Sequence, residues 1–130
     1  MKKNFTPWTK ATPPSFQFSK PADAQYTQIN FIDVPNAVQS EIAVESLVDL
    51  KMSDADYFPA LITNQILGGG GEGRLFLNLR EDKGYTYGSY SSIGSDKYAP
   101  SRFRATAQVR NAVTDSSVVE ILKEMDRIRT

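Results

Sequence analysis

The chain has 130 residues, of which 40% are hydrophobic and 23% charged, a balance typical of a globular domain rather than a disordered segment. Fifteen acidic residues balance fifteen basic ones, so the net charge provides no general attraction to nucleic acid or to an anionic membrane. The sequence contains no cysteine and no histidine, which excludes thiolate nucleophiles, Ser-His-Asp catalysis and histidine-ligated metal sites within this chain.

The N-terminal stretch differs in composition from the rest of the chain. Residues 1–25 hold four of the seven prolines and show little periodicity, so we expect an extended arm or linker there. Residues 26–130 are then the expected domain. Neither a signal-peptide apolar run nor a transmembrane stretch occurs in the sequence.

A β-hairpin is predicted at the start of the domain. The segment YTQINFID (26–33) has the composition of a strand, and VPNA (34–37) that of a turn. The segment QSEIAVESLVDL (39–50) follows, with Ile42, Val44 and Val48 on one face in period two. Two such strands joined by a short turn predict a hairpin.

A helix is predicted after residue 56. Pro59 is tolerated in the first turn of a helix, which makes Asp56 the better N-cap, and Gly68 is placed to end the helix. Apolar residues recur there at helical spacing and predict the buried face: Phe58, Leu61, Ile62 and Ile66.

A shorter helix and two strands are predicted next. The segment RLFLNLREDKG (74–84) predicts a helix that ends at Gly84 and buries Leu75, Phe76 and Leu79. Residues 85–93 and 101–110 are predicted strands. The second strand alternates clearly, with an apolar face made of Phe103, Ala105, Ala107 and Val109.

The chain closes with a predicted amphipathic helix, capped by Thr114 or Asp115. Its expected inward residues are Val118, Leu122, Met125 and Ile128. This order of elements contains hairpins rather than obligate βαβ crossovers, so we expect an α+β fold, an antiparallel sheet with helices packed on one face. The final helix runs to the end of the chain without a C-cap, which suggests a fragment.

A glycine-rich loop joins the first two predicted helices and comprises Gly68, Gly69, Gly70, Gly71 and Gly73. Three of its glycines match the spacing G-x-G-x-x-G, but a dinucleotide site requires a preceding strand, and a helix is predicted there. The P-loop pattern fails because Arg74 and Leu75 stand where lysine and serine or threonine are required. We therefore interpret the loop as a connection whose glycines permit positive φ and close backbone approach.

The same region resembles a known family. The segment NQILGGGGEGRLFLNLREDKGYTYGSYS (64–91) resembles the signature of the C-terminal, non-catalytic half of M16 zinc metallopeptidases, of the pitrilysin, insulinase and mitochondrial-processing-peptidase type. Upstream, IDVPNAVQSEI (32–42) is similar to the hairpin that precedes this signature in the family. The resemblance covers residues 26–130 and implies the LuxS/MPP-like metallohydrolase half-domain fold, in a form shorter than a complete half.

The resemblance also implies a function. In this family two homologous halves close around a chamber, and the half with an inverted H-x-x-E-H motif binds zinc and cleaves peptide bonds. The other half supplies an arginine and a tyrosine that hold substrate; by position these are Arg80 and Tyr87. The implied partners are a zinc-bearing half, on the same or a separate polypeptide, and a peptide substrate. No catalytic residue and no metal ligand is expected in this chain, and the glycine loop is expected near the chamber mouth.

Other interpretations of these residues stay open. Arg80 is also compatible with a surface ion pair at a helix C-terminus, and Tyr87 with a packed aromatic stripe. The basic row Arg102, Arg104 and Arg110 is compatible with a solvated sheet face, with the wall of the peptidase chamber, or with an RNA-binding face. RNA is disfavoured because no aromatic residues interleave with the arginines and the net charge is zero.

The sequence therefore predicts a non-catalytic M16 half-domain that positions peptide and closes the chamber for a zinc-bearing half. One alternative is a scaffolding module of the same fold without a peptidase role. Another is a carboxylate-based enzyme, although no pair stands out among the fifteen acidic residues. An exposed sheet edge or apolar helix face also predicts that the chain self-associates.

Overall fold

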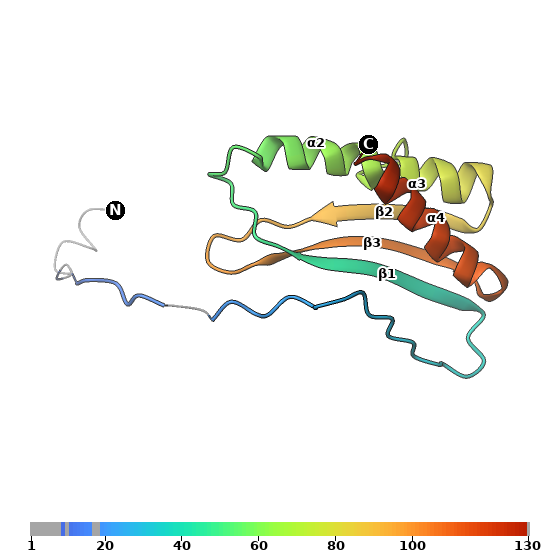
Figure 1. Cartoon of the computed structure of the whole chain (residues 1–130), viewed down its shortest axis with the longest axis horizontal. Coiled ribbons are helices and arrows are strands. Elements are labelled where there is room, and N and C mark those ends of the chain that lie inside the picture. The colour runs from blue at the N-terminus through green and yellow to red at the C-terminus, as the bar shows by residue number, and fades with distance from the viewer. Residues whose placement is uncertain (1–8, 10, 17–18, 130) are drawn as a thin grey trace.

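Three strands form one antiparallel sheet in the computed structural model, which describes residues 9, 11–16 and 19–129 (Figure 1). Their order across the sheet is β1 (Gln39–Val48), β3 (Ser101–Arg110) and β2 (Thr86–Ile93). The central strand β3 pairs with all ten residues of β1, from Gln39 opposite Arg110 to Val48 opposite Ser101. The predicted strands at 85–93 and 101–110 are therefore confirmed.

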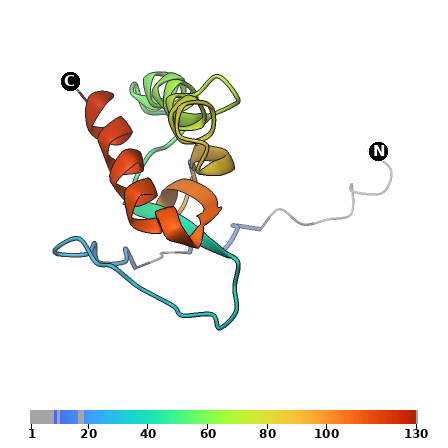
Figure 2. The same cartoon turned by 90° about the vertical axis from the view of Figure 1, so that its right-hand side faces the viewer.

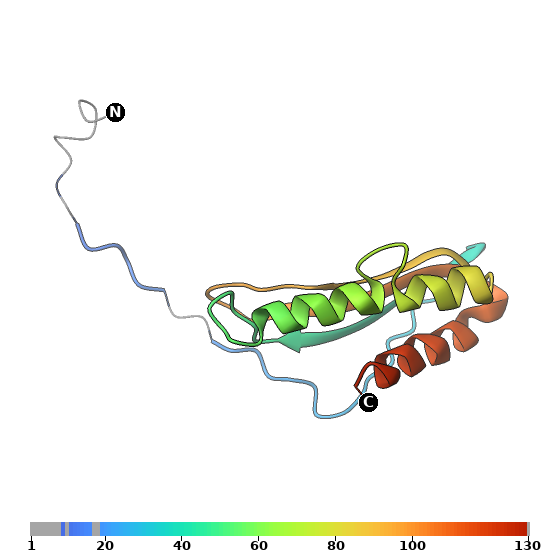
Figure 3. The ribbon, with the colours of Figure 1, turned by 90° about the horizontal axis from the view of Figure 1, so that it is seen from above.

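The helices lie on one face of this sheet, as predicted (Figure 2). They are α2 (Tyr57–Gly68), α3 (Arg74–Phe76), the π-helical η1 (Leu77–Asp82), the 3-10 turn η2 (Asn111–Val113) and α4 (Thr114–Arg127). Helix α2 and the α3–η1 segment follow one another along the sheet, with α4 beside them (Figure 3). The α+β fold is thus confirmed. No helix within the described residues has the length and apolar character needed to cross a membrane.

The core lies between the sheet and the helices. The apolar face predicted for β3 is confirmed, since Ala105, Ala107 and Val109 are buried. Two alanines in this row leave room for the helices to approach the sheet closely. Ile42, Leu67, Leu75, Leu79 and Ile121 complete the core from β1, α2, α3, η1 and α4. Burying one such leucine or isoleucine contributes about 1.5–3 kcal/mol of hydrophobic free energy.

The predicted N-terminal hairpin is wrong. Residues 26–33 form no strand and are exposed, and β1 pairs with β3 instead. The turn itself is confirmed, because the Ala37 amide donates to the Val34 carbonyl over 3.1 Å and Asn36 has a φ of 65°. The physical reason is periodicity: residues 26–33 do not alternate strictly in period two, whereas β1 matches the apolar face of β3.

The buried face predicted for α2 is wrong, because most of its apolar residues point away from the sheet. Phe58, Ile62 and Ile66 are 69%, 62% and 52% exposed, while Leu67 and Gly68 are buried. The helix turns its C-terminal end toward β2, where a glycine permits contact with the strand. Three apolar side chains therefore form a row on the outer surface of α2.

The inward face predicted for the final helix is confirmed in part. Its buried residues are Ser117, Ile121 and Glu124, and Leu122 is about half exposed. Two of these are polar residues that a hydrophobic pattern does not select. The other predicted inward residues, Val118, Met125 and Ile128, pack partly buried against the core.

Neither predicted side-chain cap forms. Asp56 occupies the N-cap position of α2 but makes no capping hydrogen bond with its side chain. Helix α4 has Val113 at its N-cap, and the Thr114 hydroxyl donates to the Asn111 carbonyl in the preceding 3-10 turn. That turn continues β3 directly into the helix and displaces the cap by one residue.

The described parts of the predicted arm contain no helix or strand and are exposed. Residues 1–8, 10 and 17–18 of this arm lie outside the described residues. An ion pair of 3.2 Å joins the Lys20 amine to the Asp49 carboxylate just after β1. The division into residues 1–25 and 26–130 stays a prediction.

Candidate functional site

Arg80 and Tyr87 line the same hollow, at the end of the sheet where β2 begins. Its volume is about 670 Å³, and the two residues enter it from η1 and β2. The other lining residues are Val38, Gln39, Glu81, Gly84, Tyr85, Thr86 and Arg110. Tertiary structure thus brings together the two site residues that the sequence predicts, from separate elements.

Arg80 lies in the π-helical turn η1 rather than in the regular helix that the sequence predicts. Such turns are rare and occur frequently at functional sites. Its guanidinium carbon lies 4.9 Å from the centre of the Phe76 ring, a cation–π contact, and the guanidinium also forms an ion pair with Glu81. Because its side chain is still 45% exposed, the guanidinium can donate hydrogen bonds to a ligand that enters from solvent.

Tyr87 lies at a β-bulge in β2. Thr86 stands opposite Val109 and Ser89 opposite Ala107, so three steps along β2 span two steps along β3. A bulge of this kind interrupts the alternation of side chains and redirects them. The Tyr87 side chain is left 89% exposed at the rim of the hollow.

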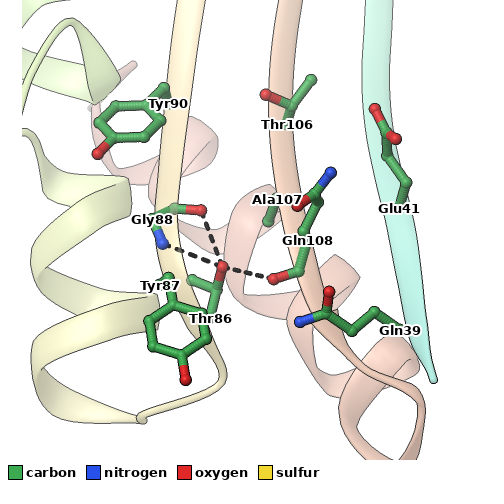
Figure 4. Close-up of a pocket in the computed structure, with 9 residues that line it drawn as sticks. All are labelled: Gln39, Glu41, Thr86, Tyr87, Gly88, Tyr90, Thr106, Ala107 and Gln108. Carbon is green, nitrogen blue, oxygen red and sulfur yellow. Dashed lines mark hydrogen bonds between the residues drawn. The ribbon is translucent and has the colours of Figure 1, made fainter.

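The Thr86 hydroxyl holds this bulge in shape (Figure 4). It accepts a hydrogen bond of 3.1 Å from the Gly88 amide. Two carbonyl oxygens lie within reach of its single proton, that of Gln108 at 2.6 Å and that of Gly88 at 2.8 Å, and the shorter distance is to Gln108. The Thr86 side chain therefore bonds both to Gly88 within the bulge and to the neighbouring strand β3, and Tyr87 lies between Thr86 and Gly88.

A second hollow, whose lining residues come from all three strands, is drawn in Figure 4. Its volume is about 510 Å³, and it shares Gln39, Thr86 and Tyr87 with the first. Its remaining lining residues are Glu41, Gly88, Tyr90, Thr106, Ala107 and Gln108. Together the two hollows form a depression from Arg80 to the polar residues of β1 and β3, with Tyr87 shared between them.

The arginines of β3 differ in their charge environment. Arg104 lies 2.8 Å from the Glu45 carboxylate and 3.6 Å from that of Glu41, and Arg102 lies 3.9 Å from Glu45. Arg110 stands opposite Gln39, a neutral amide, and forms no ion pair with any described residue. Its polar contact is a 3.5 Å hydrogen bond to the Gly84 carbonyl. Acids of β1 thus neutralise the charges of Arg102 and Arg104, whereas Arg110, which lines the hollow, has no such partner.

The glycine-rich loop lies away from both hollows, since none of its five glycines lines either one. A Cβ on Gly68 would lie 2.6 Å from the Ser91 backbone nitrogen, and one on Gly73 would lie 2.8 Å from the Gly68 Cα. The expected close approach is therefore confirmed. The expected positive φ is wrong within the loop, because Gly84 is the glycine with positive φ, at 61°.

Glu124 is a buried carboxylate that the sequence interpretation missed. It is 3% exposed and accepts hydrogen bonds of 2.8 Å from both Arg74 and Asn78, and one of 2.9 Å from Arg127. Burial opposes its ionisation, but the bonds from Asn78 and Arg74 and the charges of both arginines outweigh this and lower the pKa of Glu124. This cluster joins α4 to the α3–η1 segment that carries Arg80.

The sequence analysis did not select Thr86 as a site residue, and it placed Arg110 only in the basic row of the strand at 101–110. A glycine inside a strand pattern signals a bulge, and Gly88 was such a signal beside Tyr87. The position of Arg110 has no comparable signal, because the register that places Gln39 opposite it depends on a pairing across 71 residues. Only the paired strands show which arginine is left without an acid.

The residues of this chain do not fit a zinc site. The sequence lacks the histidines and cysteines that zinc prefers. Among the residues that the structure describes, no cluster of three acidic side chains could replace them. The chemistry available at the hollow is therefore hydrogen bonding and charge: two guanidinium groups, one carboxylate, two phenols, an amide and a threonine hydroxyl.

Comparison with known proteins agrees with this fold. The family described as peptidase M16 inactive domain matches residues 1–130. The crystal structure of a peptidase M16 inactive domain from Pseudomonas fluorescens is 27% identical, with a TM-score of 0.80 over 89% of this chain and 27% of its own. A conserved protein from Enterococcus faecalis V583 is 26% identical, with a TM-score of 0.62 over 72% of this chain and 21% of its own. A search of curated proteins finds no match.

Proposed function

The chain belongs to the peptidase M16 inactive domain family, and on that premise we propose that it holds peptide substrate and closes the chamber for a zinc-bearing half. The chain spans 27% of the length of the Pseudomonas fluorescens structure that it matches. Within this proposal the chain is the substrate-holding part of a zinc metallopeptidase and does not cleave peptide alone.

One observation carries the proposal: Arg80 and Tyr87 enter one hollow from different elements, with their polar groups accessible. A surface ion pair alone accounts for the contact of Arg80 with Glu81 but not for its place beside Tyr87. Packing does not account for Tyr87, because the side chain is almost fully exposed. Both alternatives to a binding role therefore explain less of the geometry.

The two side chains suit the backbone of a bound peptide. A guanidinium presents several N–H donors in a fixed plane and remains charged at any physiological pH, so it can hold a peptide carbonyl. A tyrosine hydroxyl can donate to the negative charge that develops on the scissile carbonyl oxygen during attack. Both groups stabilise charge by hydrogen bonding and transfer no atoms themselves.

The zinc belongs, in this proposal, to the other half. When bound there, the metal would activate water for attack on the peptide bond. The residues of the present chain would orient the peptide across the hollow and reduce access of solvent as the halves close. We assign the glycine-rich loop a packing role in this scheme, because its close contacts are with the ends of its own helices and with β2.

The test is peptide cleavage by this chain mixed with its zinc-bearing half. We expect turnover to fall about 100-fold in Tyr87→Phe, as on removal of one oxyanion donor, and at least about tenfold in Arg80→Ala. Tyr98→Phe and Arg102→Ala are matched controls, since both residues are exposed and neither lines the hollow. Binding of each variant to the zinc-bearing half is measured in parallel.

The alternative outcomes separate the competing functions. Turnover that collapses in both variants while binding to the zinc-bearing half persists supports substrate holding. Tight binding to that half with turnover indifferent to both substitutions identifies a scaffolding module instead. Peptide hydrolysis by the purified chain without the zinc-bearing half contradicts the proposal.

A further inference from the structure

We infer that Arg110 makes the hollow a carboxylate-recognition site, so that the preferred ligand is an extended peptide carrying a free carboxylate near Tyr87. The inference rests on the proposed function and adds to it a third binding residue and a class of substrate. It is carried by the distribution of charge over the open face of the sheet.

Arg110 forms no ion pair with an acid of its own sheet, because Glu41, the next acid on that face of β1, lies 3.6 Å from Arg104 instead. The acids of β1 stand where they neutralise the other arginines, with Glu45 directly opposite Arg104. At the end of the row the cross-strand partner is Gln39, which leaves the third guanidinium without an opposing charge. An arginine in this position retains its full attraction for an incoming anion.

The hollow contains one acid and two arginines. Glu81, on the same turn as Arg80, forms its ion pair with that residue and lines the hollow too. The charges of Arg80, Arg110 and Glu81 therefore sum to a single positive charge. One ligand carboxylate balances it, while a second would be repelled.

The shape of the site also suits an extended ligand. The hollow is about 670 Å³, larger than a lone carboxylate requires, and the adjoining hollow of about 510 Å³ continues it past Tyr87. The second hollow is lined by neutral polar groups, including Thr106 and Gln108, together with Glu41. A peptide chain along this depression would place its carboxylate at Arg110 and its neutral backbone over Tyr87.

The carboxylate has two possible sources, a peptide C-terminus and an acidic side chain. Four short acetylated peptides, identical except at two places, distinguish them. The C-terminus is a free acid or an amide, and the penultimate residue is glutamate or glutamine. Binding to the full chain is followed by the chemical shifts of the backbone amides of Gly84, Tyr85 and Arg110, which detects millimolar affinity.

We expect peptides with one carboxylate to bind about tenfold more tightly than the peptide with none, the equivalent of one charge-assisted hydrogen bond. Arg110→Gln should abolish this difference. Arg102→Gln is the matched control, an arginine of the same strand face that pairs with Glu45 and lies outside the hollow. Whichever single-carboxylate peptide binds more tightly identifies the source.

The outcomes also separate this inference from the proposed function. Equal affinity for all four peptides, or a carboxylate preference that survives Arg110→Gln, overturns the inference. The cleavage assay with Arg80→Ala and Tyr87→Phe can still support the proposed function in that case. Conversely, a carboxylate preference that depends on Arg110 supports the inference even if cleavage proves indifferent to Tyr87. Absence of binding by every peptide at 10 mM or so contradicts the inference as well.

Discussion

At the scale of single residues, Thr86 decides where Tyr87 points. Its hydroxyl accepts a hydrogen bond from the Gly88 amide and donates one to the Gln108 carbonyl. At the other end of the bulge the Ser89 hydroxyl donates to the Thr106 carbonyl over 3.0 Å, so Thr86 and Ser89 together link the bulged segment to β3. The exposure of Tyr87 is therefore a property of its neighbour as much as of its own side chain.

We predict that Thr86→Val destabilises the chain by about 1 kcal/mol and, under the proposed function, lowers turnover in the cleavage assay with the zinc-bearing half. Valine has nearly the same shape but leaves the carbonyl of Gln108 and the amide of Gly88 without their partner. Urea denaturation measures the first effect and the cleavage assay the second. Thr86→Ser keeps the hydroxyl and should stay within about 0.5 kcal/mol of the parent chain. Equal losses in both variants would show that the methyl group, not the hydroxyl, holds the bulge.

Glu124 shows how a buried acid can favour the charged state. Its carboxylate receives bonds from Arg74, Asn78 and Arg127, so its pKa in the folded chain lies below the usual 4.5. The pKa of Glu120 is lowered as well, chiefly by hydrogen bonds from Lys123 and Asn78. On acidification these two carboxylates are protonated in the unfolded chain before they are protonated in the folded chain. The stabilisation that they provide is therefore complete above about pH 4.5 and is lost as the pH falls through their pKa values in the folded chain.

We predict that Glu124→Gln lowers the free energy of unfolding by about 2 kcal/mol at pH 7, since it leaves the Arg74 guanidinium without its charged acceptor. The variant should also lose less stability than the parent between pH 7 and pH 3. Denaturant titrations at several pH values measure both effects. Asp126→Asn is the control, an acid of the same helix with an exposed ion pair. An acid-induced loss of equal size in Glu124→Gln and the parent would contradict the assignment.

At the scale of elements, the glycine-rich loop sets how closely α2 approaches β2. The end of α2 contacts Ser91 through Gly68, and the Asn64 amide donates to the Ser91 carbonyl over 3.3 Å. These contacts bring Leu67 into the core and turn the apolar row of Phe58, Ile62 and Ile66 outward. The direction in which α2 buries its side chains therefore follows from a glycine at its end.

We predict that Gly68→Ala destabilises the chain by about 1–3 kcal/mol, because its methyl group would meet the backbone nitrogen of Ser91. Gly71→Ala should be neutral or stabilise by up to about 1 kcal/mol, because its Cβ would have no neighbour within 4 Å. Thermal and urea unfolding of both variants provide the comparison. A similar loss in the two variants would mean that the loop needs conformational freedom rather than close approach.

At the scale of the whole molecule, the sheet has two unlike faces. The helices cover one, and the other presents the ion-paired rows of β1 and β3 together with the second hollow, while the first hollow lies at the end of the sheet. The helical layer in turn leaves the apolar row of α2 on its outer surface. Rows of this kind favour association, since water is released when two of them meet.

We predict that the isolated chain self-associates through this row, one copy against another. Sedimentation velocity should show a concentration-dependent increase in mass, which Ile62→Lys reduces. Gln65→Lys adds the same charge at another exposed position of the helix and should leave association unchanged. A single monomeric species of the parent chain at high concentration would contradict the prediction.

The sequence alone was enough to predict the α+β class, β2, β3, the turn at residues 34–37, and Arg80 and Tyr87 as the residues to examine. These features depend on local spacing, on turn chemistry and on a motif of 28 neighbouring residues. Tertiary structure decided which faces of α2 and α4 are buried and that β1 pairs with β3 instead of with residues 26–33. It also decided that Arg110 lines the same hollow as Tyr87 and that, unlike the other two arginines of β3, it forms no ion pair with a described residue. Each of those outcomes depends on groups brought together from far apart in the chain, and local periodicity carries no information about such partners.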